Sequence, residues 1–217
     1  MDVEPPQAPL SGRQAQAALN DGRILDAARE VFLADPDAPV SAVAERAGVG
    51  ISALYRRYPS KDHLMRALAE DGLTRYVADL EIALASDDDP WDVYVACLER
   101  VVDGQSQALA QRLAGTFTPT NELSTLAQHA GHLAETLFRR VRKSGDLRAD
   151  VSEADITLLL EVIALIELPG PDGGAALRRR YLALILQALR APAETKLPVA
   201  PARRADLAAR WGGKAWD

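Results

Sequence analysis

Cysteine is almost absent from this chain. Its 217 residues include one cysteine, Cys97, so no disulfide framework can form within the chain, and this composition fits a reducing compartment. Long apolar runs are also absent, because none approaches the ~20 residues that a membrane-spanning helix needs. The opening segment, MDVEPPQAPL, lacks the basic start and apolar centre of a signal peptide. We therefore expect a cytoplasmic protein that does not enter a membrane.

The residue patterns of enzymes and cofactor sites are missing as well. There is no glycine-rich loop that could cradle a phosphate, and no zinc-binding spacing of cysteine and histidine. Cys97 lies in an apolar stretch without a neighbouring base, and the run Asp87–Asp89 is typical of a loop that ends in a helix cap. We therefore predict that the chain is not an enzyme and needs no cofactor.

One group of side chains resembles a metal site. His129, His132 and Glu135 follow one another at spacings of three, which places them on one face of a helix. Histidine and carboxylate together can bind a metal ion. However, the sequence offers no fourth ligand and no second shell, so we interpret the three residues as a polar helix face and predict no metal.

Charge is unevenly distributed. The net charge of −6 argues against a general nucleic-acid binder, since nonspecific binders are usually basic. Residues 13–62, however, carry seven cations and seven acids, and the stretch 46–61 holds four cations without any acid. A local basic face on an acidic protein indicates docking to a polyanion in one orientation.

The composition favours helix almost throughout, and no segment has a strand pattern. Apolar residues recur at spacings of three and four between glycine and proline breaks. We predict an all-α fold of about nine helices, with Gly48, Asp89 and Ser152 at helix ends. The expected helices cover approximately residues 20–34, 41–47, 51–58, 61–85, 90–103, 105–114, 121–143, 152–166 and 175–190.

These helices suggest four parts. We expect residues 1–19 to be disordered or weakly ordered and residues 20–62 to form a three-helix unit. Residues 63–191 would form a larger helical body. Residues 192–217 form a proline-rich tail.

The segment from Val43 to Lys61 predicts a helix-turn-helix. Gly48 suits a tight turn between two short helices, which would hold the second helix rigidly enough to enter a major groove. Arginine can bind guanine and small apolar groups can touch thymine methyls, whereas cations and tyrosine suit phosphate. The pattern alone is equally typical of a solvated basic face. The helix-turn-helix pattern places Ile51, Ser52, Ala53, Arg56 and Arg57 on the outer side of the second helix. It suggests phosphate contacts for Tyr55, Arg57 and Lys61.

Three sequence segments favour the DNA-binding interpretation over a solvated basic face: ILDAAREVF, VAERAGV and LYRRYPSKDHL. Together they resemble the tetracycline-repressor (TetR) family of bacterial transcription regulators. The resemblance covers about residues 20–68 and implies a three-helix DNA-binding unit on a larger helical body. It implies phosphate contacts at Tyr55, Arg57 and Lys61, and base or backbone contacts at Ser41, Gly50, Ile51, Ser52, Ala53 and Arg56.

The chain departs from the family at three positions in this segment. Pro39 and Ala53 stand where the family often has threonine, and each loses a hydroxyl that could meet a phosphate or a base. Gly50 replaces a frequent serine cap, which glycine tolerates at small cost. These changes affect individual contacts and leave the expected docking mode intact.

Two C-terminal helices are candidates for a dimer interface. One helix-turn-helix contacts too little DNA for useful specificity, and a dimer reads two half-sites about 34–36 Å apart. The segment ITLLLEVIALIEL is apolar nearly all round, so one neighbouring helix cannot cover it. The alternative is that these residues form only the core of the monomer. The predicted interface residues, partly implied by the resemblance, are Ile156, Leu159, Leu160, Ile163, Ile166, Tyr181, Leu184 and Ile185.

The helices between residues 61 and 143 would surround an effector cavity. The competing interpretation is that aromatic and aliphatic residues at helical spacing are plain core. The candidate lining residues are Trp91, Tyr94, Cys97, Phe117, His129, Leu133 and Leu137.

The sequence thus predicts a homodimeric DNA-binding regulator, and specifically a repressor that a small molecule releases from double-stranded DNA. Two alternatives remain open. The chain could be an all-helical carrier or enzyme whose basic face is incidental. It could also be a protein-interaction module that uses its last helix and the tail containing Trp211 and Trp216.

Overall fold

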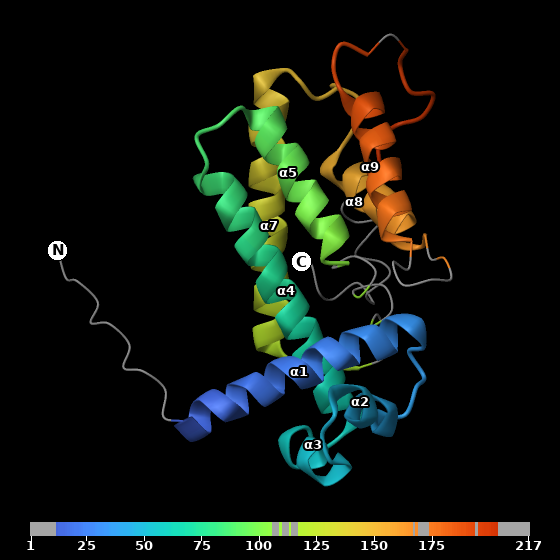
Figure 1. The fold of residues 1–217 in the computed structure, drawn as a ribbon. Helices are drawn as coiled ribbons and strands as arrows, with labels where there is room; N and C mark the ends of the chain where they lie inside the picture. The colour runs from blue at the N-terminus through green and yellow to red at the C-terminus, as the bar shows by residue number, and fades with distance from the viewer. Residues whose placement is uncertain are drawn as a thin grey trace, which may run out of the picture. The chain divides into compact units, whose positions relative to one another are not determined.

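The computed structural model describes residues 12–105, 109, 113, 117–166, 168, 174–193 and 195–203. Regular structure in these residues is helical apart from one isolated antiparallel bridge between Leu147 and Arg190, which confirms the all-α prediction. Figure 1 shows the helices α1 (Gly12–Ala34), α2 (Val40–Ala47), α3 (Ile51–Arg57), α4 (Lys61–Ala85), α5 (Pro90–Asp103), α7 (Asn121–Ser144), α8 (Glu153–Ala164) and α9 (Ala175–Leu189).

Two sequence predictions concern segments at the edge of the described residues. The helix expected near 105–114 lies largely outside them, although Leu109 and Leu113 are helical. The first helix begins at Gly12, upstream of the expected start near residue 20, and the weak order expected for residues 1–19 stays a prediction. The segment RQAQAAL contains good helix formers without proline, so the helix continues upstream of the amphipathic stretch.

The chain divides into two compact units, Met1–Leu68 and Ala69–Asp217. The division falls within α4, so this helix begins in the first unit and continues in the second. A boundary between residues 62 and 63 stays a prediction.

Helix ends follow the capping chemistry of the sequence. Asp89 accepts hydrogen bonds from the backbone N–H groups of Trp91 and Asp92, with Pro90 at the first helical position. Ser152 and Asp155 form a reciprocal capping box at the start of α8. One detail differs from the expectation. Pro39, and not Ser41, is the residue before the first turn of α2.

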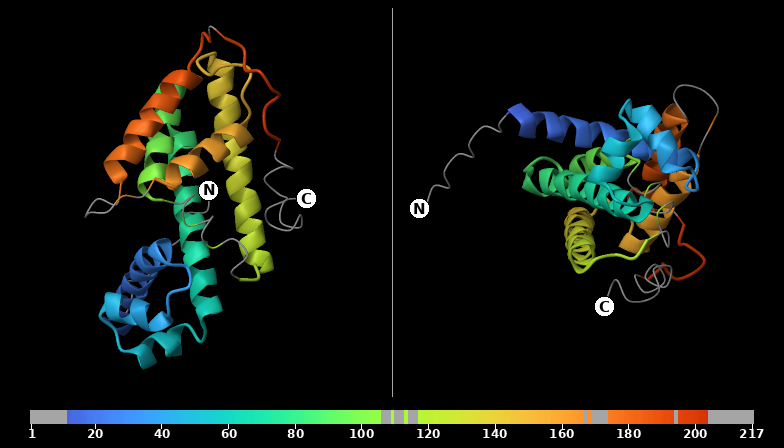
Figure 2. Two further views of the ribbon diagram at one scale, coloured as in Figure 1. Left: turned by 90° about the vertical axis from the view of Figure 1, so that its right-hand side faces the viewer. Right: turned by 90° about the horizontal axis from the view of Figure 1, so that it is seen from below.

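The first unit packs α1 against α2 and α2 against α3, as the left view of Figure 2 shows. Its interior is apolar, with Phe32, Val43, Leu54 and Leu64 completely buried. Burying one such side chain contributes roughly 1.5–3 kcal/mol. A core of this size is therefore what holds the three short elements together.

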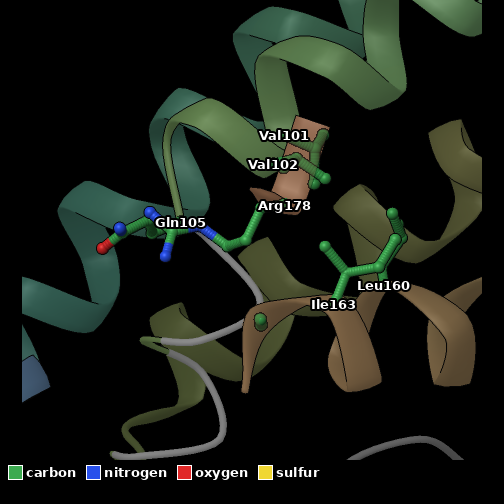
Figure 3. A pocket seen from close by; sticks show the side chains of 7 residues that line it. Val101, Val102, Gln105, Leu160, Ile163 and Arg178 are labelled. Atoms are coloured by element: carbon green, nitrogen blue, oxygen red, sulfur yellow. The ribbon is translucent and has the colours of Figure 1, made fainter. Parts of the chain in front are cut away.

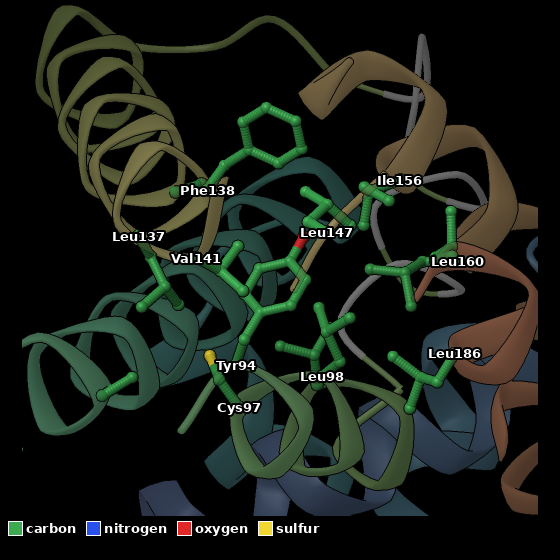
Figure 4. Close-up of a cluster of buried hydrophobic side chains, with 14 of the residues drawn as sticks. Tyr94, Cys97, Leu98, Leu137, Phe138, Val141, Leu147, Ile156, Leu160 and Leu186 are labelled. Atoms are coloured by element: carbon green, nitrogen blue, oxygen red, sulfur yellow. The ribbon is translucent and has the colours of Figure 1, made fainter. Parts of the chain in front are cut away.

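The second unit is built around α5, which packs against α7, α8 and α9. Figure 4 shows Tyr94 and Cys97 of α5 among Leu137 and Val141 of α7, with Ile156 of α8 nearby. All five are at most 4% exposed. Each residue lies on the apolar face of its helix, which agrees with the competing interpretation of plain core for Tyr94, Cys97 and Leu137.

The described part of the proline-rich tail is hydrogen-bonded along the start of α8. The backbone N–H of Leu197 donates to Asp150 Oδ2 at 2.9 Å, and that of Ala202 donates to Asp155 Oδ1 at 2.8 Å. The Arg148 guanidinium, together with the Leu197 N–H, holds the pKa of the Asp150 carboxyl well below its usual range. The tail therefore adds backbone contacts to the body.

The buried thiol gives a test of the core. Cys97 is 1% exposed, and burial raises the pKa of its thiol to about 11. Since the thiolate is the reactive form, we expect Cys97 in native protein at pH 8 to react at least about 100-fold slower than in urea-unfolded protein. A colorimetric thiol reagent measures both rates. Equal rates in the two states would contradict this packing.

Candidate nucleic-acid interface

The turn between α2 and α3 depends on a left-handed residue. Gly48 adopts φ 65°, and the backbone N–H groups of Gly48 and Val49 donate to the carbonyls of Glu45 and Ala44 at 3.1 and 3.0 Å. Only glycine takes this conformation without strain. The chain then enters α3 through Gly50, which has extended backbone.

Helix α3 contributes one buried side chain to the core of its unit. Leu54 is completely buried, and it is the only buried residue of the helix. The other six residues are exposed, among them the apolar Ile51 at 40% and Tyr55 at 46%. The predicted contact residues Ser41, Gly50, Ile51, Ser52, Ala53, Tyr55, Arg56 and Arg57 are all exposed.

Lys61 is the exception among the predicted DNA contacts. Its Nζ donates to the carbonyl oxygens of Pro36 and Ala38 at 2.8 and 3.0 Å and lies 5.2 Å from the centre of the Phe32 ring. The phosphate contact predicted for Lys61 therefore stays a prediction, and the structure adds an intramolecular role for this side chain. The ammonium satisfies two carbonyls of the α1–α2 turn, and one of its three N–H groups remains for a phosphate.

One arginine of α2 and one of α3 form ion pairs with acids of α1. Arg57 Nε donates to both Asp21 carboxylate oxygens at 2.8 and 2.9 Å, and Arg57 Nη2 lies 2.7 Å from Asp21 Oδ2. The hydrogen bond to Asp21 raises the pKa of the Arg57 guanidinium. Arg46 pairs with Glu30 in the same way. Sequence reasoning missed both acids, because nothing in the sequence indicates which residues of α1 face α2 and α3.

The glycine turn gives a matched pair of substitutions. Gly48→Ala should lower the free energy of unfolding by about 1–2 kcal/mol, because alanine is strained at positive φ and its Cβ would lie 3.1 Å from Arg23 Nη2. Gly50→Ala has negative φ and no atom within 4 Å of the new Cβ, so it should change stability far less. Urea denaturation measures both. Equal losses would contradict the special role of the turn.

The predicted effector-pocket residues lie mostly in packed core. Trp91, Tyr94, Cys97 and Leu137 belong to the buried cluster and are at most 4% exposed. Their large side chains fill the space that the prediction left for a ligand. Of the remaining candidates, Leu133 packs against the cluster, Phe117 is partly exposed, and His129 Nε2 lies 3.9 Å from Glu81 Oε1 on the exposed side of the helix.

A small hollow lies elsewhere in the body. Figure 3 shows Val101 and Val102 of α5 on one side and Leu160 and Ile163 of α8 on the other. Arg178 of α9 lines the hollow, is 5% exposed and donates to the carbonyl of Ile166 at 2.8 Å. The hollow encloses about 10 Å³, roughly enough for one water molecule. This is below the roughly 300–1,000 Å³ of typical small-molecule sites.

The predicted dimer residues separate into two groups. Ile156, Leu160 and Ile163 are at most 5% exposed within the monomer, so their assignment to an interface is wrong. Leu159, Ile166 and Ile185 are partly exposed, and Tyr181 and Leu184 are each 48% exposed. Leu165, which lies in the apolar segment expected to face a partner, is 66% exposed, whereas Val162 at 62% and Leu168 at 50% were not among the predicted interface residues.

Metal ligation and membrane insertion also bear on function. Among the described residues, no group of three histidine, cysteine or carboxylate side chains is arranged to bind a metal ion. Within the same residues, every helix is too short or too polar to cross a bilayer.

The match to a known protein family lies within the first unit of the chain. The sequence profile of the bacterial regulatory proteins of the tetR family matches residues 24–68. The HTH-type transcriptional repressor LfrR from Mycolicibacterium smegmatis is 43% identical over 83 residues. That alignment spans 38% of this chain and 41% of the relative, so the similarity to this curated protein covers less than half of its length.

Solved structures resemble the chain over a larger part of its length. A TetR transcriptional regulator from Streptomyces coelicolor is 27% identical with a TM-score of 0.58, over 80% of this chain and 99% of that one. A TetR regulator from Mycobacterium vanbaalenii is 28% identical with a TM-score of 0.54, over 81% and 98%. LfrR from Mycobacterium smegmatis in complex with proflavine has a TM-score of 0.60 at 21% identity, over 83% and 99%.

Proposed function

We propose, from the premise that this chain belongs to the TetR family of bacterial regulatory proteins, that it is a homodimeric repressor of transcription which a small molecule releases from operator DNA. The family consists of transcription regulators and not of enzymes, which agrees with the prediction that the chain is not an enzyme. The alternative of a catalytic helical protein is therefore set aside.

The observation that carries the proposal is the exposure of α3. One buried leucine holds this helix after a rigid turn, and six exposed residues surround it. They include two arginines, a tyrosine and a serine, which are side chains that bind phosphates and base edges. A helix held this way after a short turn has the geometry that enters a major groove.

A first experiment asks whether the protein binds specific DNA. Wild-type protein is used to select duplexes from a random-sequence library, and affinity for the enriched duplex is measured by fluorescence anisotropy. Arg56→Ala should then weaken binding about tenfold or more, because one arginine contact to a base contributes about 1–3 kcal/mol. Arg56 is exposed at the end of α3.

Arg139→Ala is the matched control, since Arg139 is an exposed arginine of α7 whose Nη2 donates to Thr136 Oγ1 at 3.2 Å. It should leave affinity within about twofold. If no duplex is enriched, the DNA-binding function is rejected and the carrier or protein-interaction alternative is favoured. Trp211 and Trp216, on which the interaction alternative was based, lie outside the described residues.

The dimer is supported by apolar side chains that the monomer leaves uncovered. Val162 of α8, Leu165 directly after α8, and Tyr181 and Leu184 of α9 are each about half exposed or more, and α8 packs against α9. Two such hairpins related by a two-fold axis would cover one another as a four-helix interface. The dimer would also present two copies of α3 to the DNA, one for each half-site of the operator.

A double substitution tests the interface. Val162→Asp with Leu184→Asp should convert the dimer to monomer at micromolar concentration, because carboxylates in an apolar interface cost several kcal/mol. Ile82→Asp is the control, since Ile82 of α4 is 60% exposed and outside α8 and α9. Sedimentation measures the mass, and circular dichroism confirms folding. A monomeric wild type, or a monomeric Ile82→Asp variant, would contradict the assignment.

Release by a small molecule rests on the continuity of α4. Its C-terminal end is tied to the body, because Arg140 of α7 donates to the carbonyls of Leu84 and Ser86 at 3.3 and 2.6 Å. Arg100 of α5 also donates through Nε to Asp79 Oδ1 at 2.9 Å. A ligand that shifts these partners would shift α4, which begins in the DNA-binding unit.

The ligand itself stays open. The proflavine in the LfrR structure supports a small-molecule effector in this chain without naming it, because 21% identity carries the fold alone. An effector would have to open the packed cluster around Tyr94 or enlarge the hollow beside Arg178. Its effect on DNA affinity can be no larger than its differential affinity for the two shapes of the body.

A further inference from the structure

The ion pair between Arg57 and Asp21 lies at the end of the exposed helix α3. Arg57 is the last residue of α3, and Asp21 belongs to α1. The Arg57 side chain is 61% exposed, whereas that of Asp21 is 24% exposed. The carboxylate is thus the more enclosed partner, and it holds the guanidinium at the surface.

The geometry of the pair leaves part of the guanidinium available. Of its five N–H donors, the Nε–H and one Nη2–H face the Asp21 carboxylate at 2.7–2.9 Å. The remaining three N–H groups belong to the opposite edge of the guanidinium. Because this fork arrangement is planar and bidentate, it fixes the direction of that edge as well as its position.

The pair also changes the charge that α3 presents. Nonspecific binding to DNA depends on net cationic charge and on the release of counterions. Because the Arg57–Asp21 pair is neutral overall, it contributes little to nonspecific binding. A docked specific complex depends instead on donors that stand at fixed positions on the backbone, and a pre-oriented guanidinium supplies them at a smaller entropic cost.

We propose that Asp21 is a positioning residue that increases the sequence selectivity of DNA binding. It orients Arg57 for the specific complex and cancels the charge of Arg57 in nonspecific complexes. This inference rests on the proposed function, because it assumes that α3 contacts DNA.

The same unit provides a matched control. Glu30 of α1 pairs with Arg46 at the last turn of α2, and both side chains are more than half exposed. Glu30→Gln removes the same charge from the same helix, but it frees an arginine that is not on α3. It therefore reports the effect of net charge alone.

The test compares Asp21→Asn with Glu30→Gln. Affinity is measured over a range of salt concentrations for the duplex enriched by wild-type protein and for a scrambled duplex of equal length. For Asp21→Asn we expect the ratio of specific to nonspecific affinity to fall about three- to tenfold, the cost of ordering one free arginine. The salt slope for the scrambled duplex should steepen by about 0.9. Glu30→Gln should leave the ratio within about twofold.

Two more variants show whether Asp21 acts through Arg57. Asp21→Glu keeps a carboxylate and should restore most of the ratio, which a general loss of structure would not allow. In an Arg57→Ala background, Asp21→Asn should change the ratio no further. Thermal unfolding of each variant verifies that the unit remains folded.

The outcomes separate the inference from the proposed function. An unchanged ratio for Asp21→Asn, an equal loss for Glu30→Gln, or a further loss in the Arg57→Ala background would each overturn the role of Asp21. In all three cases the wild type still binds its enriched duplex. Failure to enrich any duplex would instead reject the proposed function itself.

Discussion

The burial of Leu54 is the interaction on which the surface of the DNA-binding unit depends. Helix α3 has seven residues, too few to be stable alone in water, and Leu54 is its only buried side chain. Because a helix turns about 100° per residue, one anchored position fixes the direction of all the others. The left-handed Gly48 brings α3 onto α2 at the angle that allows this burial. A change that loosens Leu54 would therefore disturb every exposed residue of α3 at once, including those that never touch Leu54.

A second means of fixing a helix acts in both units. In the first unit, Arg23 of α1 donates to the carbonyl of Ala47 at the end of α2 at 2.8 Å, and the same kind of contact recurs in the body. There, arginines bind main-chain carbonyls at helix ends, as Arg140 does at the end of α4 and Arg178 does beyond α8. A carbonyl at a helix C-terminus has no partner within the helix, so an arginine from a neighbouring helix satisfies it and holds the two helices in register. Such contacts are directional, unlike apolar packing, and can be exchanged for others with little change in buried area. This property would suit the proposed release by a small molecule, which requires a body that is stable in two shapes.

The sequence predicted the helices well because their ends depend on local chemistry. Asp89–Pro90, Ser152 with Asp155, and Gly48 each act within one turn. The helix start at Gly12 was missed because the upstream segment has helix-forming residues without an apolar face. Long-range partners could not be predicted. Nothing in the sequence says that Lys61 meets the carbonyls of Pro36 and Ala38, or which apolar residues of α8 face inward. The periodicity of α8 is nearly uniform, so Ile163 and Val162 look alike in sequence although one is 1% and the other 62% exposed.

Pairing of charges reconciles an acidic protein with a DNA-binding role. Residues 13–62, which include α3, are neutral in sequence, yet their acids are not spread evenly among their cations. Asp21 and Glu30 engage Arg57 and Arg46 from α1, while Arg56 on α3 remains exposed. The long-range field of such a unit is weak, so it attracts DNA little from a distance. Contact must then come from a few cations at fixed positions, whose attraction is felt within a Debye length of about 10 Å. Such a surface binds strongly only where the spacing of its hydrogen-bond donors fits the DNA backbone. Having few unpaired cations therefore contributes to selectivity as much as base contacts do.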